Sequence, residues 1–144
     1  MPEAGPSQRG RELAQYRLDK AQSELDDARA LFARDSYRGS NNRAYYAIFD
    51  GLRALLALEG VDYRKHSGVI SHFQARYIKT GALGSELSRI VTSASFIRNA
   101  SDYEDFFVAS KQEAQAQLEG AARLLDAVRD YVSKAPEGES DIGE

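Results

Sequence analysis

Hydrophobic positions recur at steps of three and four residues over most of the chain, which is the period of a helix with one buried face. The first such segment runs from about Arg9 to Arg34, and its other face carries a mixture of acidic and basic residues. Its apolar positions are Leu18, Ala21, Leu25, Ala28 and Leu31 or Phe32. The pattern predicts one long amphipathic helix at the start of the folded chain.

A second helix is predicted from Ser40 or Asn41, either of which can cap it, to about Leu58, where Glu59 and Gly60 end it. Its main apolar stripe consists of Tyr45, Ile48, Phe49, Leu52, Leu55 and Leu56. The opposite side carries small residues and two charges, namely Arg43, Ala47, Asp50 and Ala54. A helix with two such faces is either central or packs against a second subunit.

The next two helices are separated by a glycine-containing break. A short helix is predicted from about His66 to Tyr77, and Ser85 can cap a fourth helix after residues 80–84. The apolar stripe of this fourth helix is Leu87, Ile90, Val91, Ala94 and Ile97. Arg98 follows four residues after Ala94 and therefore lies at the end of that stripe.

The last helix follows an irregular segment, residues 101–107. Ser110 and Glu113 have the spacing of a capping box, and apolar residues with heptad-like spacing follow as far as Val132. We find no strand-like alternation and no repeat. The fold class predicted is therefore all-α, an antiparallel up-down bundle of four long helices plus one short helix over residues 9–133, with flexible ends at 1–8 and 134–144.

The net charge of −3 comes from the acidic tail. The segment 134–144 has one Lys and four acidic residues, so the totals of 19 basic and 22 acidic residues leave 18 of each for the remainder. The rest of the chain has no net charge and therefore lacks the positive electrostatic potential of a general nucleic-acid-binding protein, so an RNA contact would need a local basic cluster. The chain has no long apolar span or signal-type segment, so we expect no membrane contact and a cytoplasmic location.

Several kinds of chemistry are disfavoured by the residues present. Without any Cys there are no thiolate ligands and no thiol nucleophile. The two histidines, His66 and His72, point about 240° apart on a helix and cannot share a metal ion on one face. No Glu-x-x-His pair, phosphate loop or nucleophile elbow is present. We therefore expect neither a metal nor another cofactor.

Four separated segments of the chain share a pattern with a known family. They are YRLDKA at 16–21, YRGSNNRAYYAIF at 37–49, HSGVISHF at 66–73 and RNASDY at 98–103. These segments resemble the HEPN superfamily, especially its small stand-alone prokaryotic members, occur in the expected order, and together with the last helix cover about residues 16–131. No single segment is specific, but the set of four is.

The resemblance implies a helical bundle, commonly a homodimer, often encoded beside a minimal nucleotidyltransferase as a toxin–antitoxin or defence pair. Catalytic members are metal-independent ribonucleases with an Arg, four to six residues and then a His, and both copies of the motif line one cleft. Arg98 matches the arginine, but the histidine window holds Tyr103, Glu104 and Asp105. Tyrosine, with an ordinary pKa of about 10, is a poor base at neutral pH.

The candidate residues form two groups. Arg98, Asn99, Asp102 and Tyr103 match the degenerate catalytic segment, and Asn42, Arg43, Tyr46 and Asp50 are candidates for RNA or ligand binding. Arg98 is expected either to bind a phosphate or to form an ion pair with a carboxylate of this chain, which would be Asp50 or Asp102. We expect a structural role for His66, since it would have to reach Arg98 across the bundle.

Three functions remain open from the sequence. The first is a dimeric module that binds RNA, a nucleotide or a nucleotidyltransferase antitoxin. The second is a metal-independent ribonuclease in which Tyr103, Glu104 or Asp105 takes the place of the histidine. The third is a purely structural helical adaptor.

Overall fold

The computed structural model describes residues 5–136, and throughout that range the chain forms helices and short connections without a strand. The elements are α1 (Gln8–Ala33), α2 (Tyr37–Glu59), α3 (His66–Phe73), the π-helical turn η1 (Gln74–Ile78), α4 (Glu86–Tyr103) and α5 (Lys111–Lys134). The predicted all-α class and the antiparallel bundle are confirmed. The expected flexible ends fall mainly outside the described residues, although Gln8 already belongs to α1 and Lys134 to α5.

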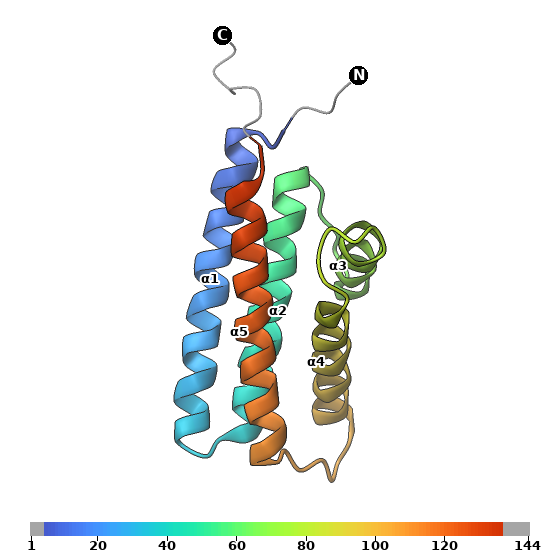
Figure 1. The fold of residues 1–144 in the computed structure, drawn as a ribbon. Helices are drawn as coiled ribbons and strands as arrows, with labels where there is room; N and C mark the ends of the chain where they lie inside the picture. Colours follow the sequence, from blue (N-terminus) through green and yellow to red (C-terminus); the bar gives the residue numbers. More distant parts are fainter. Residues whose placement is uncertain (1–4, 137–144) are drawn as a thin grey trace.

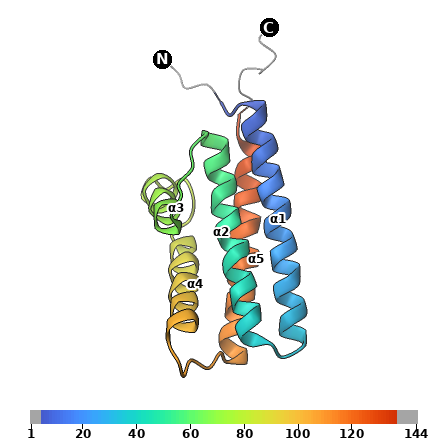
Figure 2. The ribbon, with the colours of Figure 1, turned by 180° about the vertical axis from the view of Figure 1, so that it is seen from behind.

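Helix α2 lies at the centre of the molecule. Figure 1 shows α1, α2 and α5 side by side along the length of the bundle, with α4 on the α3 side of α2. The short α3 runs across the end of α4, and the view from behind shows the same arrangement (Figure 2). Because α2 contacts α1, α3, α4 and α5, the expectation that it is a central helix is confirmed.

Small residues allow α1 and α2 to pack closely. Ala14, Ala21 and Ala28 repeat every seven residues on α1 and are fully buried, as are Ala47 and Ala54 on α2. Alanine side chains keep the two backbones near each other, while leucines fill the rest of the core. Each fully buried leucine contributes about 1.5–3 kcal/mol relative to an exposed one, so this interior sets the positions of all the helices.

Helix α2 begins earlier than its sequence predicts. It starts at Tyr37, and Ser36 is the N-cap residue, so the predicted start at Ser40 or Asn41 is wrong. The Ser40 hydroxyl instead donates to the backbone oxygen of Ala28 on α1, at 2.9 Å. A polar side chain that resembles a cap is thus used to join two helices. The predicted end is correct, because Gly60 adopts the left-handed conformation with φ 74°.

The other boundaries differ in two places. The third helical segment changes from α-helix to a π-helical turn after Phe73 and ends at Ile78. Helix α4 continues to Tyr103, so residues 101–103 are helical rather than irregular. The Ser110 half of the predicted capping box is confirmed, since the Ser110 hydroxyl accepts from the backbone N–H of Glu113 at 3.0 Å, whereas one buried oxygen of the Glu113 carboxylate has no hydrogen-bond partner among the described residues.

Candidate functional site

Arg98 lies on the last two turns of α4 and reaches toward two neighbouring tyrosines of α2. Its guanidinium carbon is 4.8 Å from the ring centre of Tyr45 and 5.7 Å from that of Tyr46. One of its terminal nitrogens also donates to the Tyr46 hydroxyl at 3.4 Å. The electron-rich faces of aromatic rings attract a cation at such distances, so α2 holds the guanidinium in place without neutralising it.

Asp102, one helical turn after Arg98, is the carboxylate that the structure places beside it. The closest approach is 3.6 Å, from the Arg98 Nε to an Asp102 oxygen, and the Arg98 side chain keeps 27% of its surface exposed. This Nε has no hydrogen-bond partner within the described residues. Burial opposes the charge of Arg98, but the hydroxyls of Tyr46 and Tyr45 together with Asp102 raise its pKa overall. Arg98 is therefore a permanent, partly exposed cation.

His66, the first residue of α3, completes the group. Its Nδ1 lies 2.9 Å from the Tyr45 hydroxyl and 3.5 Å from a terminal nitrogen of Arg98. Its ring stacks on Phe49 with the ring centres 3.9 Å apart. An arginine can only donate, so Nδ1 acts as the acceptor in this arrangement, and the neutral ring carries its proton on Nε2.

The environment keeps His66 neutral. Burial of the ring, followed by the charges of Arg98 and Arg53, lowers its pKa from the ordinary value of 6.5. A neutral imidazole with a proton on Nε2 is a hydrogen-bond donor, not a proton acceptor, at that atom. The histidine beside Arg98 is therefore suited to hold an oxygen atom of a ligand.

Asn42 and Arg43 adjoin this group through Tyr46. The Arg43 guanidinium carbon is 5.5 Å from the Tyr46 ring centre, so this ring is within reach of two arginines, Arg43 and Arg98. Arg43 also forms a 2.9 Å ion pair with Glu24 of α1 and donates to the Asn42 amide oxygen at 3.0 Å. Both candidates therefore border the Arg98 group, with Arg43 already paired to a carboxylate.

The remaining candidates do not join the group. Asp50 is 3% exposed and lies on the side of α2 that faces α1, where the Lys20 ammonium is 3.8 Å from it. Asn99 is exposed, and Tyr103 is 83% exposed, at the end of α4. Of the two carboxylates considered for Arg98, the structure places Asp102 and not Asp50 next to it.

The expectation that His66 is remote from Arg98 is wrong. The loop of residues 60–65 between α2 and α3 is short, so the first residue of α3 comes back alongside α2, next to Tyr45 and Phe49. The brevity of this loop is a sequence signal that places His66 near α2, but it does not place Arg98 of α4 beside it. Tyr45 was assigned to the core, and it is buried, yet its hydroxyl also positions His66.

Two negative findings concern residues 5–136 only. Within that range no group of three or more His, Asp or Glu side chains is placed to hold a metal ion. Within the same range no helix is long and apolar enough to cross a membrane.

Several known proteins are similar to this chain over most of its length. The chain is 29% identical over 120 residues to a UPF0332 protein of Thermotoga maritima, covering 83% of this chain and 91% of that one. It is 32% identical over 115 residues to the Methanocaldococcus jannaschii protein named "Putative toxin MJ0142", covering 80% and 78% of the two chains. The protein named "Putative toxin MJ0605" from the same organism is 31% identical over 119 residues, 83% of this chain and 88% of that one.

A solved structure has a similar fold. The crystal structure of an archaeal HEPN homologue matches with a TM-score of 0.60 at 18% identity, covering 83% of this chain and 97% of the other. The family model described as the HEPN domain matches residues 14–131, which reach from within α1 to within α5. This chain belongs to the HEPN domain family.

Proposed function

We propose that this chain is the toxin-type member of a toxin–antitoxin or defence pair, a dimeric HEPN module that binds RNA or a nucleotide around Arg98. Its family membership supports the class of protein, and the names of the two Methanocaldococcus relatives support the toxin role. The local group of Arg98, Tyr46 and His66 supports the kind of ligand. These side chains supply a cation and hydrogen-bond donors, which phosphate oxygens accept.

The observation that carries the proposal is that Arg98 is partly exposed and only loosely paired with a carboxylate. It keeps about a quarter of its side-chain surface, 27%, and its contact with Asp102 is a 3.6 Å ion pair with no hydrogen bond at Nε. An arginine with a purely structural role would be expected to make closer, bidentate bonds to a carboxylate. Arg98 makes no such bidentate pair, and although its Nε is buried, the exposed part of its side chain can meet a phosphate oxygen.

Binding of a short single-stranded RNA tests this proposal. We expect Arg98→Gln to weaken binding at least about tenfold at low salt, and to reduce the dependence of affinity on salt, because one phosphate contact is lost. Arg89→Gln is the matched control, since Arg89 is an exposed arginine on the same helix. Equal affinities of the two variants would remove Arg98 from the proposed site, provided that both unfold at the same temperature as wild type.

A nucleotidyltransferase is the partner that we propose, in line with the resemblance of the chain to small HEPN proteins of such pairs. Co-expression with a nucleotidyltransferase encoded beside it should yield a complex that survives affinity purification. A chain that stays alone during co-purification, while binding RNA as described, would disprove the partner and leave the ligand site intact.

A metal-independent ribonuclease is the second candidate, favoured by the position of Asp102. Its carboxylate is 41% exposed and lies beside Arg98, so it can accept the proton of a 2′-hydroxyl while Arg98 stabilises the charged phosphorus centre. The 2′-oxygen would bond to phosphorus, the bond to the 5′-oxygen would break, and water would protonate the departing oxygen. RNA cleavage in excess EDTA that disappears in both Arg98→Gln and Asp102→Asn would establish this activity, and cleavage unchanged in both variants would exclude it.

A further inference from the structure

A pocket with no assigned role is bordered by His66 and does not have Arg98 among its lining residues. It has a volume of about 450 Å³, which is within the range of small-molecule sites. Its walls come from α2, the α2–α3 loop and the first residue of α3: Phe49, Arg53, Asp62, Tyr63, Arg64 and His66. The pocket therefore shares His66 with the Arg98 group described above.

The pocket carries excess positive charge. Its one carboxylate, Asp62, is already bound by Arg17 at 3.2 Å and by Arg53 at 3.0 Å, and it accepts from the backbone N–H of Tyr63 at 2.9 Å. Arg64 is exposed and forms no ion pair with any described residue. Two arginines, Arg53 and Arg64, thus line the pocket beside its one carboxylate, and Arg64 is available for an anionic group such as a phosphate.

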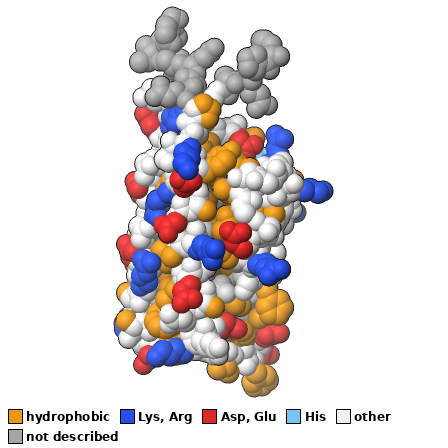
Figure 3. All heavy atoms as spheres, in the orientation of Figure 1, with side chains coloured by type: hydrophobic (Ala, Val, Ile, Leu, Met, Phe, Trp, Pro, Cys, Tyr) orange, Lys and Arg blue, Asp and Glu red, His pale blue; other side chains and the backbone are white. Residues whose placement is uncertain are grey.

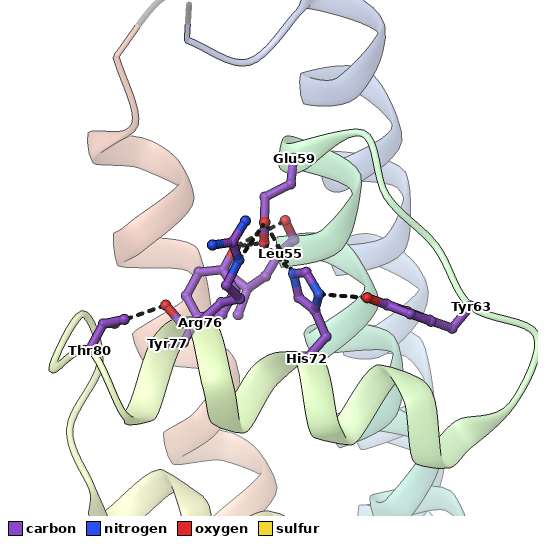
Figure 4. Close-up of polar contacts among 7 residues, drawn as sticks. All are labelled: Leu55, Glu59, Tyr63, His72, Arg76, Tyr77 and Thr80. Carbon is purple, nitrogen blue, oxygen red and sulfur yellow. Dashed lines mark hydrogen bonds and ion pairs between the residues drawn. The ribbon is translucent and has the colours of Figure 1, made fainter. Parts of the chain in front are cut away.

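An aromatic wall of the pocket is held in place by a chain of hydrogen bonds. Tyr63 is 45% exposed, and its hydroxyl lies 2.9 Å from Nδ1 of His72. The other ring nitrogen of His72 is 3.0 Å from a carboxylate oxygen of Glu59, as Figure 4 shows. A large exposed ring with a fixed hydroxyl loses little freedom when a planar group stacks on it.

We propose that this pocket is a subsite for one nucleotide, in which Arg64 and Arg53 bind a phosphate and the Tyr63 ring stacks on the base. The proposal deepens the proposed function and rests on it, because His66 joins this pocket to the phosphate site at Arg98. A single RNA strand can then place adjacent units in the two sites. Mononucleotide binding at this pocket is nevertheless measurable without Arg98.

Titration of the wild-type chain with adenosine 5′-monophosphate, followed by backbone NMR shifts, tests the subsite. We expect saturable shifts at residues 62–66, and at least about threefold weaker binding in Arg64→Gln and in Tyr63→Ser, which remove a charge contact and a stacking ring respectively. Tyr63→Phe keeps the ring and should stay closer to wild type than Tyr63→Ser. Arg123→Gln is the matched control, because Arg123 is an exposed arginine on α5 and outside the pocket.

Adenosine and inorganic phosphate serve as partial probes. Each should bind more weakly than the nucleotide, because each engages only one wall of the pocket. The subsite is disproved if the nucleotide causes no saturable shifts, if either partial probe binds as tightly, or if Arg64→Gln behaves like Arg123→Gln. Arg98→Gln distinguishes the two hypotheses: if it leaves RNA affinity unchanged, the proposed function fails, whereas the mononucleotide outcomes above, which do not involve Arg98, decide the subsite.

Discussion

At the scale of single residues, the ring of His66 is held between groups that oppose its protonation. Phe49 covers one face at a ring-centre distance of 3.9 Å, and Arg98 lies 3.5 Å from Nδ1. Protonation would place a second cation against Arg98 in a partly desolvated site. The same arrangement that presents a neutral donor to a ligand therefore costs stability whenever the ring becomes charged.

The pKa of His66 follows from this arrangement. In wild type we expect it below 6.5, because burial and then Arg98 and Arg53 lower it. Arg98→Gln removes one of the two cations and should move the pKa of His66 upward, while burial keeps it below the ordinary value. The measurement is an NMR titration of the histidine ring protons, and the spectrum of His72→Gln identifies the signal of His66.

The same shift predicts a pH dependence of stability. A folded-state pKa below the unfolded value means that the unfolded chain binds more protons between the two values, so the unfolding free energy falls as the pH is lowered through 6.5. His66→Gln should flatten that part of the profile. An upward shift of the pKa on folding, or a profile unchanged by the substitution, would contradict the placement of His66 beside Arg98.

Asp50 provides a second residue-scale prediction. Burial raises the pKa of the Asp50 carboxyl above its ordinary value, and the charge of Lys20 opposes this shift. The folded protein therefore binds this proton more readily than the unfolded chain does, and the stability that the proton contributes is lost as the pH rises through the folded pKa. Asp50→Asn removes the buried charge at pH 7 and should raise the unfolding free energy by about 1 kcal/mol. Chemical denaturation at pH 7 and near pH 4.5 checks it, since the gain should shrink at the lower pH. A loss of more than about 1 kcal/mol at pH 7 would show that the charge itself stabilises the contact with α1.

At the scale of helices, α2 and α5 approach closely at a glycine. A Cβ atom on Gly51 would lie 2.8 Å from one methyl group of Leu125 and 3.5 Å from one of Leu124. Both leucines are fully buried, so neither has free space in which to move. On α5, a Cβ on Gly120 would come no nearer than 3.2 Å, to a methyl group of Ile90, which is only partly buried.

Substitution of these two glycines by alanine should therefore have different effects. Gly51→Ala should destabilise the protein by about 1–3 kcal/mol because of overpacking. Gly120→Ala should be near neutral, because a gain in helix propensity of up to about 1 kcal/mol offsets a small displacement of Ile90. Thermal or urea unfolding of both variants provides the comparison, and equal effects would mean that α2 and α5 are not in close contact at Gly51.

The helices themselves could be predicted, because each has a buried face that leaves a three-and-four spacing in the sequence. Their ends were harder to place, since the cap-like Ser40 binds Ala28 on another helix and no local pattern records such a contact. Arg98 and Asp102 could be paired from their spacing of one helical turn. The contact between His66 and Arg98 could not, because it depends on the path of the loop that brings α3 back to α2.

At the scale of the whole molecule, apolar side chains gather at one end of the surface. Figure 3 shows hydrophobic atoms exposed around the lower end of α4 and its connection to α5. Four of the large exposed hydrophobic residues belong to this region, namely Phe96 at 74%, Tyr103 at 83%, Phe106 at 95% and Val108 at 84%. We call these four residues the α4 patch. Arg98 and Asp102 lie on the last turns of the same helix, but their side chains point about 200° and 240° away from that of Phe96.

Removing the α4 patch should prevent the dimer that we propose. The wild-type chain should sediment as a dimer at micromolar concentrations, since a stable interface needs about 800 Å² from each partner and four large exposed side chains supply much of its apolar core. The double substitution Phe96→Ser and Phe106→Ser should give a monomer with an unchanged circular-dichroism spectrum, because neither side chain contributes to the interior. Tyr16→Ser is the control, as Tyr16 is a large residue, 63% exposed, on α1. A wild-type monomer, or a dimer that persists in the double variant, would mean that Arg98 binds its ligand without a second copy of the chain at the α4 patch, and the proposed site would then have to be complete within one subunit.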